Sequence, residues 1–185
     1  MIIRKANFED ASAISPLLLL AMEEVFYDFI GNNTYEIAES FLTKLVQQKG
    51  NQYSFENCWI VEFENQITGV VCVYDGANLS ALRNPIIKEI KTTFKQDFNP
   101  ENETQSGEIY IDCVGINTNF QGRGIGSKLF NFLIEEFVEK QQKNLGLLVD
   151  IDNPKAEKLY KKLGFKKVGE KQLSGKNFNH LQIKA

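Results

Sequence analysis

The sequence is poor in the residues that bind metals or form disulfides. It contains one histidine, His180, and three cysteines that lie far apart, Cys58, Cys72 and Cys113. A single histidine excludes a multi-histidine metal centre and disfavours a Ser-His-Asp triad. The cysteine spacing matches neither a metal motif nor a disulfide framework. We therefore expect reduced, buried thiols in a cytoplasmic protein.

Strong net charge and long apolar runs are missing as well. The net charge of −3 gives no reason to expect a basic surface for nucleic acid. No apolar run is long enough to cross a bilayer, and residues 1–6 lack the apolar block of a signal peptide. A length of 185 residues suits one domain with a substantial core. These features predict a single domain, residues 1–185, that binds neither nucleic acid nor membrane.

Residues 108–140 form the most informative stretch. A run of strand formers, residues 108–116, is followed by a polar turn and then by glycines at every second position, Gly122, Gly124 and Gly126. After them, apolar residues recur at intervals of three and four, which is typical of an amphipathic helix. The predicted unit is strand, glycine turn, helix.

This order of elements favours an anion at the turn. The first helical turn leaves backbone N–H groups without partners, and its dipole makes that end electropositive. A Walker loop is excluded because Ser127-Lys128 has the reverse order of its Lys-Ser pair. A dinucleotide fingerprint needs G-x-G-x-x-G, and here the spacing is G-x-G-x-G.

Two motifs in sequence order resemble those of the GCN5-related N-acetyltransferases, the GNAT family. Gln121-x-x-Gly124-x-Gly126 resembles the family's motif A, which holds the pyrophosphate of acetyl-coenzyme A (acetyl-CoA). Asn153-x-x-Ala156-x-x-Leu159-Tyr160, followed by Gly164-Phe165, resembles its motif B. The resemblance covers the second half of the chain closely and the first half weakly.

The resemblance implies an α/β, GNAT-like three-layer fold, in which a mixed, twisted sheet of about seven strands carries helices on both faces. It also implies acetyl-CoA as the acyl donor. The pantetheine arm would pair with backbone at the end of the strand, where Gly115 fits a bulge. The residues expected to bind the donor are Val114, Gly115, Ile116, Gln121, Gly122, Arg123, Gly124, Ile125, Gly126, Ser127 and Asn153.

The family also suggests catalytic residues. Tyr160 corresponds to a tyrosine that protonates the leaving thiolate in many members. Glu108 stands where one branch carries a glutamate base, and a raised pKa would suit it to take the amine proton. Asp112 is the rival base or an anchor for the amine, and water is a further alternative. His180, in the final strand pair, is expected at the surface or in the core rather than in catalysis.

The rest of the chain supplies the expected remaining elements. Asn7, with Asp10 as capping-box partner, begins a first helix, whose expected buried face includes Met22, Val25 and Phe29. A second helix starts near Thr34. Two hairpins are expected, at residues 57–74 and 165–183, with parallel strands at 108–116 and 145–151. Residues 76–107 are interpreted as a helical and loop insertion, with Pro85 in a first helical turn and 99–107 as an exposed loop.

The function predicted is N-acetyl transfer from acetyl-CoA to a primary amine, on a small molecule or a peptide, by direct attack. The acceptor stays open, although acidic residues on the first helix, Glu23, Glu24 and Asp28, favour a cationic one. A non-catalytic acetyl-CoA sensor or interaction module is the alternative, and a nucleotide-binding enzyme is a third possibility. Either a monomer or a homodimer fits the sequence.

Overall fold

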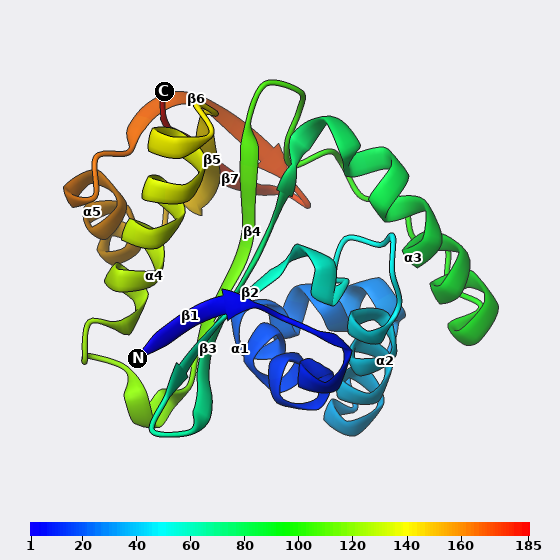
Figure 1. Ribbon diagram of the computed structural model, residues 1–185. Coiled ribbons are helices and arrows are strands. Elements are labelled where there is room, and N and C mark those ends of the chain that lie inside the picture. The colour runs from blue at the N-terminus through cyan, green and yellow to red at the C-terminus, as the bar shows by residue number, and fades with distance from the viewer. The chain divides into compact units, whose positions relative to one another are not determined.

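A computed structural model describes residues 1–185 and shows a mixed α/β protein with one seven-stranded sheet (Figure 1). The strand order is β1-β2-β3-β4-β5-β7-β6, with β4 and β5 parallel. This confirms the expected sheet. The elements are β1 Ile2–Lys5, η1 Phe8–Asp10, α1 Ala11–Ile30, α2 Tyr35–Gln47, η2 Phe55–Asn57, β2 Cys58–Phe63, β3 Gln66–Asp75, η3 Gly76–Asn78, α3 Leu79–Phe94, β4 Ile109–Ile116, η4 Thr118–Phe120, α4 Ile125–Leu133, η5 Ile134–Lys140, β5 Leu145–Asp150, α5 Pro154–Lys162, β6 Lys166–Leu173 and β7 Lys176–Ile183.

The chain divides into two compact units. The first comprises Met1–Val73, Ser80–Asn99 and Cys113–Gly126. The second comprises Tyr74–Leu79, Pro100–Asp112 and Ser127–Ala185. Each unit is described by itself below. None of the helices has the length and apolar character that a bilayer crossing requires.

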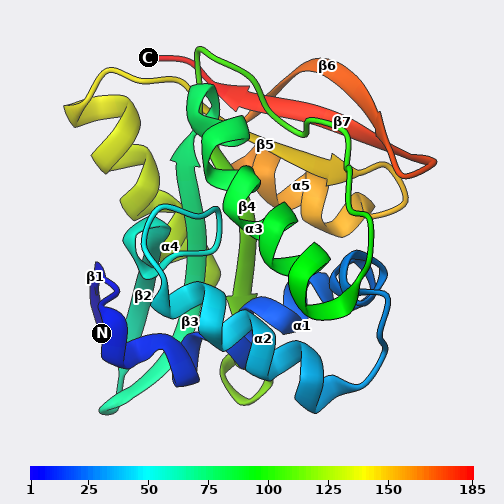
Figure 2. The same cartoon turned by 90° about the vertical axis from the view of Figure 1, so that its right-hand side faces the viewer.

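In the first unit, helices α1 and α2 lie side by side (Figure 2). At their contact the ring of Phe26 in α1 lies 6.2 Å from that of Phe41 in α2. Tyr53, in the loop after α2, packs on the same Phe26 ring at 6.0 Å. Strands β2 and β3 form the expected hairpin, whose two-residue turn places Glu64 and Asn65 at positive φ. The two turn residues are adjacent in the chain, so local sequence determines the hairpin.

Helix α1 departs from the expected buried face. Its backbone is non-helical at Met22, so the helix kinks there. Beyond the kink the buried positions are Phe26 and Ile30, each one residue later than predicted, while Val25 is exposed. A regular 3.6-residue period cannot anticipate this shift, since the kink rotates the second half of the helix.

Helix α3 begins earlier than predicted. Its first residue is Leu79, so Pro85 lies in the helix interior rather than in the first turn. Leu79, Ile86 and Ile90 are buried along one stripe, and this packing outweighs the hydrogen bond that proline cannot donate. The following loop is largely exposed, as expected, except that Thr104 is buried.

In the second unit, β5, β7 and β6 continue the sheet through antiparallel pairs. Helix α5 packs beside β5, capped by Asn153 as predicted. The helix that follows the glycine turn is α-helical only as far as Leu133 and then widens into a π-helix over Ile134–Lys140. The 3.6-residue apolar period gives no sign of this widening, which is rare in proteins.

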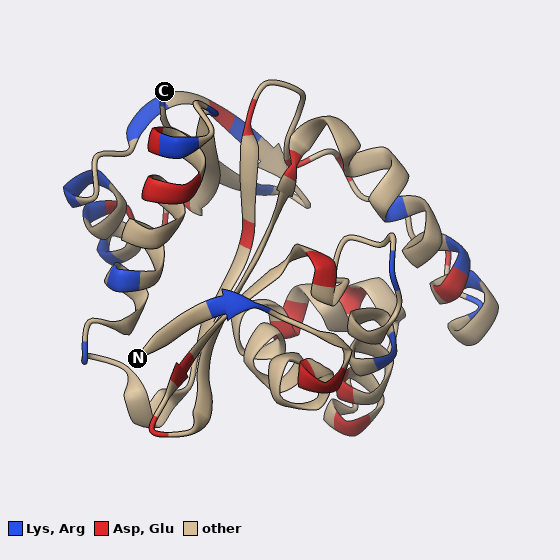
Figure 3. Cartoon of the chain, viewed as in Figure 1, with Lys and Arg blue, Asp and Glu red and all other residues tan.

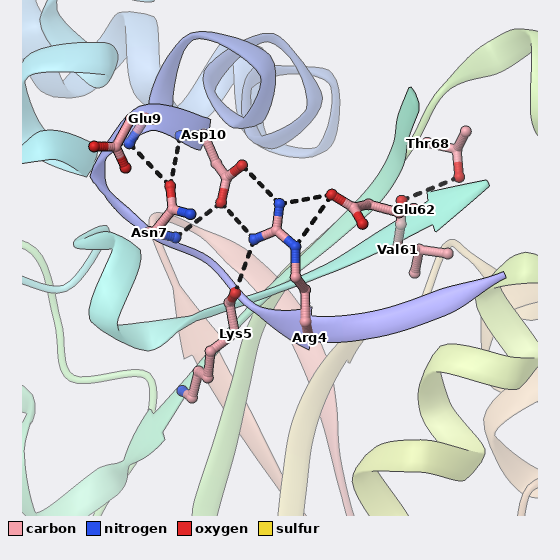
Figure 4. Close-up of polar contacts among 8 residues, drawn as sticks. All are labelled: Arg4, Lys5, Asn7, Glu9, Asp10, Val61, Glu62 and Thr68. Atoms are coloured by element: carbon pink, nitrogen blue, oxygen red, sulfur yellow. Dashed lines mark hydrogen bonds and ion pairs between the residues drawn. The ribbon is translucent and has the colours of Figure 1, made fainter. Parts of the chain in front are cut away.

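An ion-pair network ties β1 to the start of the first helical segment (Figure 4). Arg4 donates from Nη1 and Nη2 to the carboxylate oxygens of Asp10, at 2.7 and 2.9 Å, and from Nη2 to Oε1 of Glu62 at 2.6 Å. Asp10 also completes the predicted capping box with Asn7. Hydrogen bonds from Arg4 hold the pKa of Asp10 below its usual value.

Asp10→Asn should lower the free energy of unfolding by about 1–2 kcal/mol at pH 7, because the neutral amide loses the charge-assisted bonds. A carboxylate with a lowered folded-state pKa stabilises the fold above its ordinary pKa, and this stabilisation is lost as the pH falls through the folded value. The difference from wild type should therefore shrink below pH 3.8. Urea unfolding at pH 7 and at pH 3 measures it.

Asp97→Asn is the matched control, because Asp97 pairs with Lys91 with 89% of its side chain exposed. It should change stability by less than about 0.5 kcal/mol. Equal losses in the two variants would contradict the importance assigned to the Arg4–Asp10 pair.

Candidate active site

The three glycines before and at the start of α4 are glycine for different reasons. Gly122 and Gly124 both adopt φ of +76°, which side chains rarely tolerate. Gly126 has ordinary helical geometry, and a Cβ built on it would meet no atom within 4 Å. Neither backbone strain nor crowding therefore requires a glycine at position 126. The missing side chain leaves open space in front of the first turn of α4.

The backbone around this turn offers free hydrogen-bond donors. The N–H groups of Gly122, Arg123 and Gly124 make no hydrogen bond within the protein. Those of Ile125, Gly126 and Ser127 belong to the first turn of α4, where intrahelical partners are missing. Such a row of donors at a helix N-terminus suits an anion.

Two side chains shape the turn. The amide of Gln121 donates from Nε2 to the carbonyl oxygen of Ile116 at 3.1 Å, which closes the loop back onto the end of β4. The guanidinium of Arg123 lies 5.1 Å from the ring centre of Phe120. Arg123 is exposed, so its charge is available to a bound anion. Gln121 thus has a structural task whether or not it touches a ligand.

Strands β4 and β5 pair over a short distance. Their parallel ladder consists of Ile109 with Leu145, Tyr110 with Gly146 and Ile111 with Leu147. Beyond this last pair, β4 continues to Ile116 and β5 to Asp150. Val114 and Ile116 are half-buried and lie in the part of β4 that has no β5 partner.

Gly115 is required by packing. A Cβ on Gly115 would lie 1.9 Å from the carbonyl oxygen of Leu17 in α1, so only glycine fits between the strand and the helix. This close approach accounts for the glycine without the bulge expected from sequence. Nearby, Cys113 is half-buried, whereas Cys58 and Cys72 are fully buried as expected.

Tyr160 and Asn153 come from α5 and the residue before it. The Tyr160 ring packs against Phe130, with ring centres 5.1 Å apart, and against Phe165 at 6.0 Å. Burial raises the pKa of Tyr160, and its hydroxyl makes no hydrogen bond in the structure. Asn153 is exposed, and its side-chain oxygen accepts from the N–H of Ala156 at 3.1 Å.

Glu108 lies in a buried polar cluster. The residue is 3% exposed, and its carboxylate accepts from Thr104 at 2.6 Å and from Gln182 at 2.6 Å. Nε2 of His180 lies 2.7 Å from the same carboxylate. Burial opposes the charged form, but the hydrogen bonds from these three side chains outweigh it and lower the pKa of Glu108.

The expectation of a raised pKa for Glu108 is therefore wrong. A buried carboxylate with three hydrogen-bond partners and a lowered pKa is a poor proton acceptor. The sequence does not reveal these partners, because His180 and Gln182 are distant in the chain and Thr104, four residues away, lies in a loop expected to be exposed. The one feature of the sequence that could have suggested this cluster is the single histidine, His180, which lies within the final strand.

A model described as the acetyltransferase (GNAT) family matches residues 22–165. The chain belongs to the GNAT acetyltransferase family. Its motif A and motif B both fall inside the matched range, and the seven-stranded mixed sheet agrees with the family fold.

Solved structures of similar proteins cover nearly the whole chain. A structure described as an acetyltransferase has a TM-score of 0.83 at 30% identity and aligns with 100% of this chain and 99% of its own. An N-acetyltransferase from Staphylococcus aureus Mu50 has a TM-score of 0.85 at 24% identity, over 99% of this chain and 100% of its own. The second likeness shows the fold alone.

Curated relatives match over shorter stretches. A mycothiol acetyltransferase from Corynebacterium aurimucosum is 39% identical over 59 residues, 32% of this chain and 19% of that protein. A probable spermine N(1)-acetyltransferase from Bacillus subtilis subsp. natto is 29% identical over 76 residues, 40% of this chain and 50% of that protein. The matched stretch thus spans half or less of these relatives' lengths.

Gly115→Ala should destabilise this GNAT chain by about 2–4 kcal/mol, because its Cβ would overlap the main chain of Leu17. Gly126→Ala is the control, since its Cβ meets nothing and alanine favours a helix. Urea unfolding compares the two. Unchanged stability in Gly115→Ala would contradict the close approach.

Proposed function

We propose that this GNAT chain transfers an acetyl group from acetyl-CoA to a primary amine by direct attack. The observation that carries the proposal is the row of free N–H groups before and within the first turn of α4, which opens onto space at Gly126. Diphosphate is an anion of the size and charge that such a row of donors accommodates. Family membership supports an acyl-transferring role for the same turn.

Donor binding is assigned to backbone more than to side chains. The N–H groups of residues 122–127 would hold the diphosphate, with Arg123 as a mobile charge. The backbone of residues 114–116 would pair with the pantetheine arm in the manner of an added strand, since β5 does not pair with this part of β4. Asn153 has a free amide group beyond its capping oxygen and would also contact the arm.

Tyr160 is proposed as the acid that protonates the leaving thiolate. Burial raises its pKa, so the hydroxyl keeps its proton at neutral pH and can donate it when the C–S bond breaks. Because the hydroxyl makes no hydrogen bond in the protein, no internal partner competes for it.

A cationic acceptor such as a polyamine is supported by the acidic residues of α1 and α2, which are red in Figure 3. Glu23 accepts from the hydroxyl of Tyr27 and raises the pKa of that tyrosine to about 12. Burial raises the pKa of Tyr35, and Glu39, Glu23 and Glu36 add to the shift, which places these carboxylates near one another. None of them forms an ion pair. The match to spermine N(1)-acetyltransferases agrees with this acceptor class.

The first test combines calorimetric titration with acetyl-CoA and a thiol-release assay over spermine, spermidine, amino acids and short peptides. We expect binding, and thiol release with at least one polyamine. Binding without release for any amine would favour a sensor. Binding of ATP or NAD that coenzyme A cannot displace would favour a nucleotide-binding enzyme.

Tyr160→Phe should lower kcat by about 10²-fold, because the thiolate loses its proton donor. Removing a hydroxyl without a hydrogen-bond partner should change stability by less than about 0.5 kcal/mol, and acetyl-CoA affinity should stay near wild type. Thiol release, thermal unfolding and titration separate the three effects. An unchanged kcat would remove Tyr160 from the mechanism.

Gly126→Val should weaken acetyl-CoA binding more than tenfold, because its side chain would fill the space assigned to the diphosphate. Gly169→Val is the matched control, since Gly169 also has ordinary backbone geometry and no atom within 4 Å of its Cβ position. Calorimetric titration of both variants measures the difference. Wild-type affinity in Gly126→Val would contradict the assigned cradle.

A further inference from the structure

The buried cluster around Glu108 lies on one face of the sheet in the second unit. Gly146 allows the carboxylate to lie over β5, because a Cβ there would be 1.9 Å from Oε2 of Glu108. Gly146 pairs with Gln182, and Leu148 pairs with His180. Side chains of directly paired residues share a face, so Glu108, His180 and Gln182 lie together on it.

Helix α5 covers the other face of these strands. Asn179, next to His180 on β7, donates from Nδ2 to Glu157 of α5 at 3.1 Å. Since neighbouring residues of a strand point to opposite faces, His180 points away from α5. It is paired with Leu148, one residue beyond the last β4–β5 pair at Leu147. His180 therefore lies beside the place where the β4–β5 ladder ends.

The Glu108 carboxylate determines which nitrogen of the His180 imidazole carries the proton. Nε2 of His180 lies 2.7 Å from Oε2 of Glu108, so it carries a proton and donates it. The opposite nitrogen, Nδ1, makes no hydrogen bond in the protein and is not sealed from solvent. A neutral ring held in this tautomer presents a basic lone pair at Nδ1.

Other titratable groups share this face. They are Tyr74, Glu103 and Tyr110, the carboxylates Asp112 and Asp150, and the lysines Lys166 and Lys171 of β6. Glu103 accepts from the hydroxyl of Tyr74, and Lys171 donates to the carbonyl oxygen of Asn102. Among these groups, Glu108 is the one whose carboxylate lies within hydrogen-bond distance of the imidazole.

We propose that His180 is the general base for the acceptor amine and that Glu108 is the residue that positions it. This inference rests on the proposed acetyl transfer. His180 takes a proton from the ammonium form of the acceptor at Nδ1, the neutral amine attacks the thioester carbon, and a C–N bond replaces the C–S bond. The thiolate leaves as coenzyme A with the proton of Tyr160, the second proton of the attacking nitrogen passes to the tyrosinate, and His180 releases its proton to solvent.

The tautomer can be tested without turnover, because His180 is the only histidine in the chain. Long-range ¹H–¹⁵N spectra of untagged, ¹⁵N-labelled protein show one imidazole. At pH 8 we expect a protonated Nε2 and an unprotonated Nδ1. A proton on Nδ1 at pH 8, from the opposite tautomer or from a permanently charged ring, would overturn the proposal.

His180→Gln tests the kinetic role. The glutamine amide can still donate to Glu108, so thermal unfolding should stay close to wild type, as should the KM for acetyl-CoA. With spermine as acceptor, kcat should fall about 10²-fold. The acidic limb of the kcat/KM pH profile should also disappear, since the titrating base is gone.

Thr104→Val is the matched control, because it removes one hydrogen bond from the same carboxylate and keeps the imidazole. It should lower stability but preserve the acidic limb. A retained limb in His180→Gln, or its loss in both variants, would assign His180 a structural role only. Turnover by the wild-type protein tests the proposed function independently. If no amine is acetylated, the proposed acetyl transfer is wrong. The NMR spectra still decide the tautomer of His180 in that case.

Discussion

The short pairing between β4 and β5 is the constraint on which the proposed chemistry depends. Backbone N–H and C=O groups need partners, and a strand that leaves its neighbour after three pairs retains groups that a ligand can satisfy. The glycine turn follows β4 after the short η4, and α4 begins after it. One extended ligand could thus meet strand backbone and helix N-terminus in succession, with little demand on particular side chains.

Local signals account for most of what the sequence predicts correctly. Asn7 and Asp10 form a capping box from residues three apart, and Asn153 caps α5 through the N–H of Ala156. The turn glycines have spacing that only a few motifs share, and two of the three need the positive φ that the structure gives them. In each case the interacting groups lie within a few residues, so the sequence displays them directly.

Features that depend on distant contacts were not predictable. Glu108 and His180 are 72 positions apart, and the residues next to each in the chain do not indicate that the two are in contact. The same reasoning explains the early start of α3 before Pro85, where tertiary packing overrides local preference. The lowered pKa of Glu108 could not be predicted for the same reason, because its neighbours in space decide the direction of the shift.

The contact between Glu108 and the backbone of Gly146 joins the two positions into a coupled pair. While residue 108 is a glutamate placed as in this structure, position 146 has no room for a side chain. A relative with a short residue at position 108 is free to place alanine or valine at 146, whereas a glutamate carboxylate held as in this structure favours glycine. Covariation of these two columns in an alignment would mark the family members that share the buried carboxylate.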